Sequence, residues 1–183
     1  FTSNNFFELS NFRITDEYPF GTQLNNRVTI TQVAPVHFRG CNFANDNSAL
    51  QSSALNVGSG IFAVDANFTL DRKIVGSVTT RSSVRNFNNG VYAIFLFTNR
   101  PYVVQFTDFT DNETGILSGA VNNCTIFSNT FTETNWNFVT NTGVFVDRGI
   151  GWSIRDNIFS GAGQYLWTFP RTWGTVVKNT NAT

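Results

Sequence analysis

The 183-residue chain has little charge, only two lysines and no methionine. Charged residues make up 13% of the sequence, about half of their share in ordinary soluble domains. The 12 basic side chains also balance the 12 acidic ones. A surface this sparse and balanced has no electrostatic attraction for nucleic acid or for an anionic membrane. The near absence of lysine argues against helical repeats, which are rich in Ala, Leu, Glu and Lys.

Long apolar runs and common catalytic signatures are missing as well. The longest apolar run, residues 91–97, is far short of the roughly 18 to 20 residues that a membrane helix needs, so we expect no membrane span. The sequence has no nucleophile elbow, phosphate-binding loop or dinucleotide fingerprint. Because it has neither a methionine nor a signal peptide, we expect it to be a mature or internal piece of a longer chain.

What the chain does have is a recurring phrase of five or six residues that closes on phenylalanine. The intervals between the closing residues are 44, 22, 22 and 28, which we interpret as two periods, one, one, and one with a six-residue insertion. A repeat of this length predicts a solenoid. The closing residues are Phe43, Phe87, Phe109, Phe131 and Phe159.

The residues inside the repeat favour strands over helices. Short runs of Val, Ile, Phe and Thr alternate with clusters of Asn, Asp, Gly and Ser, and a glycine followed by apolar residues opens each copy at Gly60, Gly90, Gly115 and Gly143. We therefore predict an all-β fold of stacked parallel strands in coils of about 22 residues. Equivalent side chains would then lie about 4.8 Å apart, with the phenylalanines in an internal stack.

Asparagine precedes the closing phenylalanine by two residues in Asn129-Thr130-Phe131 and Asn157-Ile158-Phe159. We expect Asn129 and Asn157 to form part of an amide ladder. With the glycine-opened phrases, these endings resemble the right-handed parallel β-helix, the pectate-lyase-like fold, and are similar to secreted or surface β-helix proteins of Bacteroidota. The resemblance is clearest over residues 28–163.

The resemblance implies one β-helix domain over residues 1–183 and a secreted or cell-surface location. It says little about activity, because this fold carries lyases, hydrolases, epimerases, adhesins and tail fibres alike. A β-sandwich would explain the strands but not the recurring interval of 22. Because terminal coils need covering, we expect neighbouring segments or partner chains to cap both ends.

The two cysteines and the single histidine offer no metal-site spacing. Cys41 and Cys124 lie four periods apart by this count, about 19 Å along the axis, well beyond the ~7 Å limit for Cα atoms joined by a disulfide. We predict two buried free thiols. The sequence gives no sign of a resident cofactor.

One weak calcium candidate is present. Asp111 and Glu133 each follow a closing phenylalanine by two residues, so the repeat places them in neighbouring coils. Paired carboxylates could share Ca²⁺, which takes six to eight oxygen ligands. Solvated turn residues are the favoured explanation, because only these two carboxylates line up in consecutive coils.

A carbohydrate-binding surface is predicted in the C-terminal third. Polysaccharide lyases and hydrolases of the β-helix fold use carboxylates or an Arg or Lys base next to sugar-stacking aromatics. Trp136 and Trp152 could stack on sugars in this way, beside Asp147, Arg148 and Arg155. The alternative is that Asp147 and Arg148 pair in a turn and that tryptophan closes the end of the core.

Two functions remain open. The first is a non-enzymatic extracellular module, an adhesin or stalk segment that presents polar ladders to a polysaccharide or another surface ligand. The second is a carbohydrate-active β-helix enzyme, a polysaccharide lyase or glycoside hydrolase, or a fragment of one. Acidic and basic side chains that converge on one groove would indicate the enzyme, and scattered ones the module.

Overall fold

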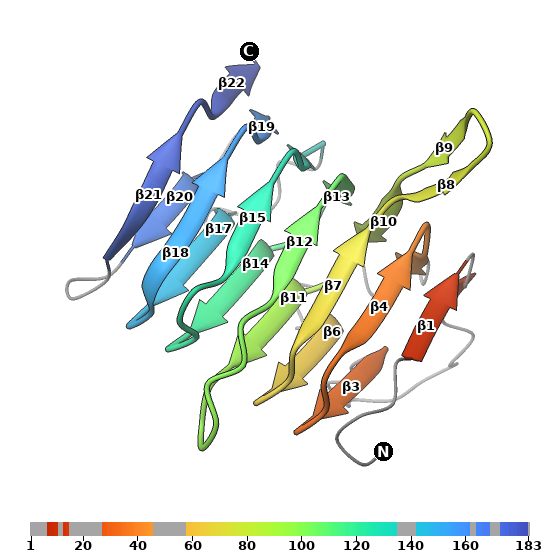
Figure 1. The fold of residues 1–183 in the computed structure, drawn as a ribbon. Coiled ribbons are helices and arrows are strands. Elements are labelled where there is room, and N and C mark those ends of the chain that lie inside the picture. Colours follow the sequence, from red (N-terminus) through yellow and green to blue (C-terminus); the bar gives the residue numbers. More distant parts are fainter. Residues whose placement is uncertain are drawn as a thin grey trace.

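Three long parallel sheets make up the protein (Figure 1). The computed structural model describes residues 7–10, 13–14, 27–45, 58–134, 142–161, 164–168 and 173–182, and these contain no helix. It follows that none of the described residues belongs to a helix that could cross a membrane. The prediction of an all-β chain of stacked parallel strands is confirmed, and the arrangement is compatible with a parallel β-solenoid.

We call the sheets A, B and C. In stacking order, sheet A contains β1 (Phe7–Ser10), β4 (Val36–Arg39), β7 (Phe68–Asp71), β12 (Val103–Gln105), β15 (Thr125–Phe127), β18 (Ile150–Arg155) and β21 (Trp173–Val177). Sheet B contains β2 (Arg13–Ile14), β5 (Asn42–Ala44), β10 (Ser82–Arg85), β13 (Thr107–Thr110), β16 (Thr130–Thr132), β19 (Ile158–Ser160) and β22 (Thr180–Ala182). Sheet C contains β3 (Val28–Thr31), β6 (Ser59–Val64), β11 (Asn89–Ile94), β14 (Thr114–Gly119), β17 (Thr142–Asp147) and β20 (Gln164–Thr168).

From β3 onward the chain visits the sheets in the fixed order C, A, B, and we call each such passage a coil. Hydrogen-bonded residues at equivalent positions in successive coils are 41, 25, 22, 28 and 22 residues apart. The interval of 41 includes a two-stranded antiparallel hairpin, β8 (Lys73–Val75) and β9 (Val78–Thr80), which projects from the stack in Figure 1.

The register corrects one part of the predicted phenylalanine column. Strand β10 pairs directly with β5, so the interval that the sequence divided into two periods is a single long coil. Val84, and not Phe87, pairs with both Phe43 and Phe109. Phe87 is buried three residues further along the chain. The prediction failed here because an insertion as long as a period looks like an additional period.

Beyond this point the phenylalanine column is regular. Phe109, Phe131 and Phe159 pair in register, and their rings stack with 4.9 Å between neighbouring centroids and 9° between ring planes. The opening glycines make room for these rings. A Cβ atom on Gly115 would lie 2.6 Å from Cδ1 of Phe131, and one on Gly90 would lie 2.8 Å from Cδ1 of Phe109. The two recurring phrases of the sequence are therefore opposite sides of one packing contact.

A polar column follows the corner between sheets A and B. The side-chain oxygen of Asn129 accepts a bond from the backbone N–H of Thr107 (3.0 Å), Asn157 accepts one from Asn129 (3.0 Å), and Asn179 accepts one from Asn157 (3.0 Å). Each amide group also donates to a backbone carbonyl of the preceding coil, which for Asn129 is that of Val104 (2.9 Å) and for Asn157 is that of Ile126 (3.1 Å). These bonds satisfy buried backbone groups where the strands end.

Single residues with positive φ turn the chain at many corners. In this left-handed region an L residue other than Asn or Asp is uncommon, and a bulky one is an outlier. At the A–B corner these residues are Gly40, Phe106, Ser128, Asp156 and Lys178. Phe106, with φ of 47°, is the bulky exception in this set.

Both cysteines are buried free thiols. Cys41 and Cys124 lie three coils apart, one fewer than the sequence count because of the long coil. At about 14 Å along the axis they are still too distant for a disulfide. Burial raises the pKa of the Cys124 thiol, so this group stays protonated in the core.

Candidate binding surface

The carbohydrate-binding set predicted from the sequence does not converge on one surface. Trp136 lies outside the described residues. Trp152 is 6% exposed and faces the core, where its ring occupies the space beside Gly174 that a Cβ atom would need. The prediction that Trp152 stacks on a sugar is therefore wrong. Its position explains the glycine one coil later.

The three charged members of that set lie at opposite ends of β18. Asp147 and Arg148 form an exposed pair at the corner between sheets C and A (3.0 Å), and Arg155 pairs with Asp156 at the corner between sheets A and B (3.1 Å). At about 3.3 Å per residue, the strand holds the two corners roughly 20 Å apart. These side chains cannot contact one sugar unit together.

Asp111 and Glu133 occupy equivalent positions in neighbouring coils, as the repeat predicted. The Asp111 carboxylate accepts bonds from the backbone N–H and the hydroxyl of Thr134, both at 2.6 Å. The described residues contain no cluster of three or more His, Cys, Asp or Glu side chains that could hold a metal ion. Asp111 therefore stabilises the segment that follows β16 in the next coil.

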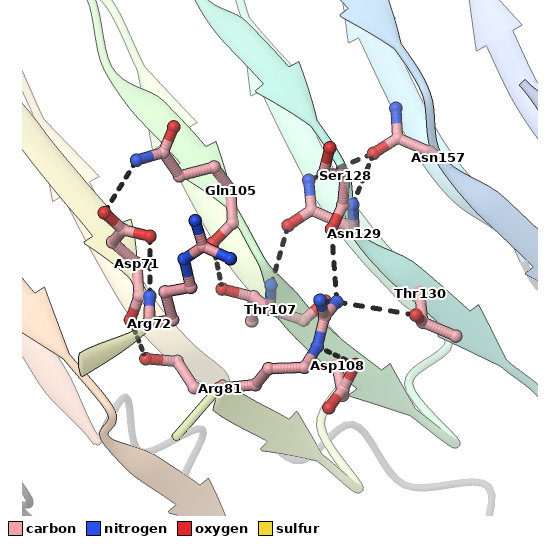
Figure 2. Close-up of polar contacts among 11 residues, drawn as sticks. Asp71, Arg72, Arg81, Gln105, Thr107, Asp108, Ser128, Asn129, Thr130 and Asn157 are labelled. Carbon is pink, nitrogen blue, oxygen red and sulfur yellow. Dashed lines mark hydrogen bonds and ion pairs between the residues drawn. The ribbon is translucent and has the colours of Figure 1, made fainter. Parts of the chain in front are cut away.

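A dense set of polar contacts lies at the corner between sheets A and B (Figure 2). Arg81 reaches from the base of the hairpin across two coils. Its Nε donates to Asp108 (2.7 Å), and its guanidinium also donates to the carbonyls of Thr107 (3.3 Å) and Ser128 (3.1 Å). In the same view, Asp71 accepts bonds from the backbone N–H of Arg72 (2.6 Å) and the amide of Gln105 (2.7 Å).

Two guanidinium groups at this corner stack on aromatic rings. The Cζ atom of Arg72 lies 3.7 Å from the centroid of Phe106, and that of Arg155 lies 4.5 Å from the centroid of Phe127. The two rings meet edge to face, with centroids 5.4 Å apart. We call Arg72, Phe106, Phe127 and Arg155 the Arg–Phe row. It runs along the stacking axis with one member in each of four successive coils.

Charge is unevenly distributed around the stack. The A–B corner, with the start of the hairpin, carries six basic and three acidic residues, although the whole chain is balanced. The basic ones are Arg39, Arg72, Lys73, Arg81, Arg155 and Lys178, and the acidic ones are Asp71, Asp108 and Asp156. The corner between sheets B and C carries the acidic residues Asp111, Glu113 and Glu133 and only two basic ones, Arg27 and Arg85.

A second surface, the outward face of sheet C, was not predicted from the sequence. Phe62, Tyr92, Leu117 and Phe145 pair in register and are half-buried. The rings of Phe62 and Tyr92 lie 5.2 Å apart. The signal was available in the opening phrases, because the second residue after each glycine points away from the core when the first points inward.

Next to this face, a buried carboxylate holds the loop that follows β11. Asp65 accepts hydrogen bonds from the backbone N–H groups of Leu96 (2.8 Å) and Phe97 (3.1 Å), whose side chains are 57% and 78% exposed. Burial raises the pKa of Asp65, but these donors, Thr98 and the charge of Arg100 outweigh it, so that the pKa is lowered overall.

We expect Asp65→Asn to reduce the free energy of unfolding by about 1 kcal/mol at neutral pH, because bonds to a charged acceptor are stronger than those to an amide. The folded-state pKa is depressed, so the contribution is complete above the ordinary value of about 4 and is lost as pH falls through the lowered pKa. Denaturant titrations at several pH values test this. A stability difference that persists unchanged in acid would contradict it.

In comparisons with family models, curated proteins and solved structures, no match to the chain was found. The fold places this protein among all-β proteins built from long parallel sheets, and its function has to be argued from its own residues.

Proposed function

We propose that this chain is a non-enzymatic extracellular module, an adhesin or stalk segment of a secreted or cell-surface bacterial protein. The observation that carries the proposal is the continuous fastening of coil to coil by the Asn129, Asn157 and Asn179 column beside the stacked phenylalanines. Such a stack is a stiff rod that displays side chains at fixed spacing along its length.

The proposal includes a right-handed parallel β-helix in which a coil without insertions has about 22 residues. Two of the register intervals are 22, and the longer ones contain insertions. A strand, a crossover and a second parallel strand in the same sheet are joined right-handedly in about 98% of cases. The path from β6 through sheets A and B to β11 is such a connection.

The use of charged side chains also supports a module without catalysis. Arg81 and Asp108 bridge neighbouring coils, Asp71 holds Arg72 and Gln105, and Asp111 holds Thr134. These groups stabilise corners. A carbohydrate-active enzyme remains the second candidate, because Asp71, Arg72, Arg81 and Asp108 gather at one corner (Figure 2).

A polysaccharide screen separates the two candidates. The purified chain is incubated with acidic and neutral polysaccharides, with and without Ca²⁺, and the products are analysed for new reducing or unsaturated ends. We expect no new ends. Cleavage that disappears in Asp108→Asn would identify an enzyme and refute the module.

Location is tested separately. Antibodies raised against the purified chain should label intact cells of the source organism or its culture medium. Labelling that requires cell lysis would contradict an extracellular role.

A further inference from the structure

We propose that the Arg–Phe row binds an acidic polysaccharide laid along the stacking axis. The inference rests on the proposed function of a non-catalytic surface module and specifies its ligand and its site. The proposed site lies at the A–B corner. It includes Arg155, which was predicted from the sequence, and it does not depend on Trp136 or Trp152.

The first argument is the state of the two guanidinium groups. The Arg72 guanidinium lies over the Phe106 ring, and among the described residues no carboxylate pairs with this guanidinium, because Asp71 bonds to Arg72 only at the backbone N–H. Stacking fixes the plane of a guanidinium while leaving its N–H edge free, and this edge matches a carboxylate in a two-pronged contact. Arg155 lies over Phe127; its Nη1 donates to Asp156 (3.1 Å), and 46% of its side chain stays exposed.

The second argument is the backbone of Phe106. Its φ of 47° is costly for an aromatic residue, and the equivalent corners of other coils use Gly40, Ser128, Asp156 and Lys178, none of them aromatic. A glycine or asparagine would turn the chain here with less strain. The aromatic ring at this corner is not required for the turn, but it holds Arg72 in place.

The third argument is the length of the row. Arg72 and Arg155 are three coils apart, about 14 Å at the spacing of parallel strands. A small anion cannot contact both, whereas a polymer with repeated acidic groups can. The half-buried rings of Phe106 and Phe127 lie between the two guanidiniums, where the apolar faces of sugar rings would pack. This favours a polysaccharide over an acidic peptide, and the modest basic excess favours it over nucleic acid.

The test measures the affinity of the purified chain for alginate, a polymer of uronic acids, with neutral dextran, poly-glutamate and single-stranded DNA as competitors. We expect alginate to bind best and its affinity to fall as salt is raised. Arg72→Gln and Arg155→Gln should each weaken binding roughly two- to fivefold, as expected for loss of one exposed charged contact. Arg148→Gln changes an arginine at the other end of β18 that is more exposed than Arg155 (72% against 46%), and this variant should bind as the unmodified protein does.

Phe106→Asn separates binding from folding. Asparagine suits a positive φ, so the unfolding midpoint should be unchanged or higher, while alginate binding falls because Arg72 is no longer held. Equal loss of binding in Arg148→Gln, unchanged binding in the Arg72, Arg155 and Phe106 variants, or equal binding of dextran, poly-glutamate or DNA would each overturn the site.

The two proposals fail in different ways. Absence of alginate binding overturns the site but leaves a structural rod intact. Cleavage of alginate refutes the non-catalytic module, and whether the row positions the polymer is then still decided by the three variants.

Discussion

Replacing Phe131 with alanine should lower the free energy of unfolding by about 3 to 5 kcal/mol, the usual cost of truncating a buried phenylalanine. Its ring is 5% exposed and stacks on both Phe109 and Phe159. The substitution therefore breaks the stack in two places and leaves a cavity that neighbouring backbone, fixed by strand pairing, cannot fill.

Phe97→Ala is the matched control, because this ring is 78% exposed. It should change stability by less than about 0.5 kcal/mol. Equilibrium denaturation of the two variants gives the comparison. Similar losses in both would show that the phenylalanine stack does not carry the stability assigned to it.

The second large effect is expected for Asn157→Leu, which keeps the side-chain volume but removes the amide. Asn157 is fully buried. Its oxygen accepts from the N–H of Asn129 (3.0 Å), and its nitrogen donates to the carbonyl of Ile126 (3.1 Å). The N–H of Asn129 would stay buried without a partner, at a cost of about 1 to 3 kcal/mol, and loss of the bond to the Ile126 carbonyl would add about 1 kcal/mol.

Asn89→Leu provides the comparison, since Asn89 is half-exposed on β11 and its side chain makes no hydrogen bond within the described residues. A change within about 0.5 kcal/mol is expected there. If the two leucine variants unfolded at the same denaturant concentration, the amide column would be incidental to stability.

The sequence predicted the architecture because the inward-facing residues repeat along the chain. Phe109, Phe131 and Phe159, with Asn129 and Asn157, sit at equivalent positions because each column demands the same shape from every coil. Phe87 was misplaced because insertions change the interval without changing the column. A surface insertion does not change the core residues, so the repeat pattern does not show where the insertion lies.

The binding surface was harder to foresee for a related reason. Arg72 and Phe106 lie at the corners of different coils, and their contact follows from a register that includes the hairpin. Tryptophan is a common sugar-stacking residue, which drew attention to Trp152, yet that side chain fills the core. Outward-facing side chains do not have to repeat from coil to coil. Their contacts with neighbouring coils can therefore be found only once the register of the strands is known.

The amide column also has a direction, which bears on how the rod is assembled during synthesis. Asn129, Asn157 and Asn179 each donate to a backbone carbonyl of the preceding coil. Each new coil therefore supplies the side chain that bonds it to the coil already folded. Each step closes only one coil, and the entropy of closure depends on that coil and not on the length of the finished rod. Contacts between neighbouring coils stay close in sequence however many are added, so lengthening the rod need not slow its folding.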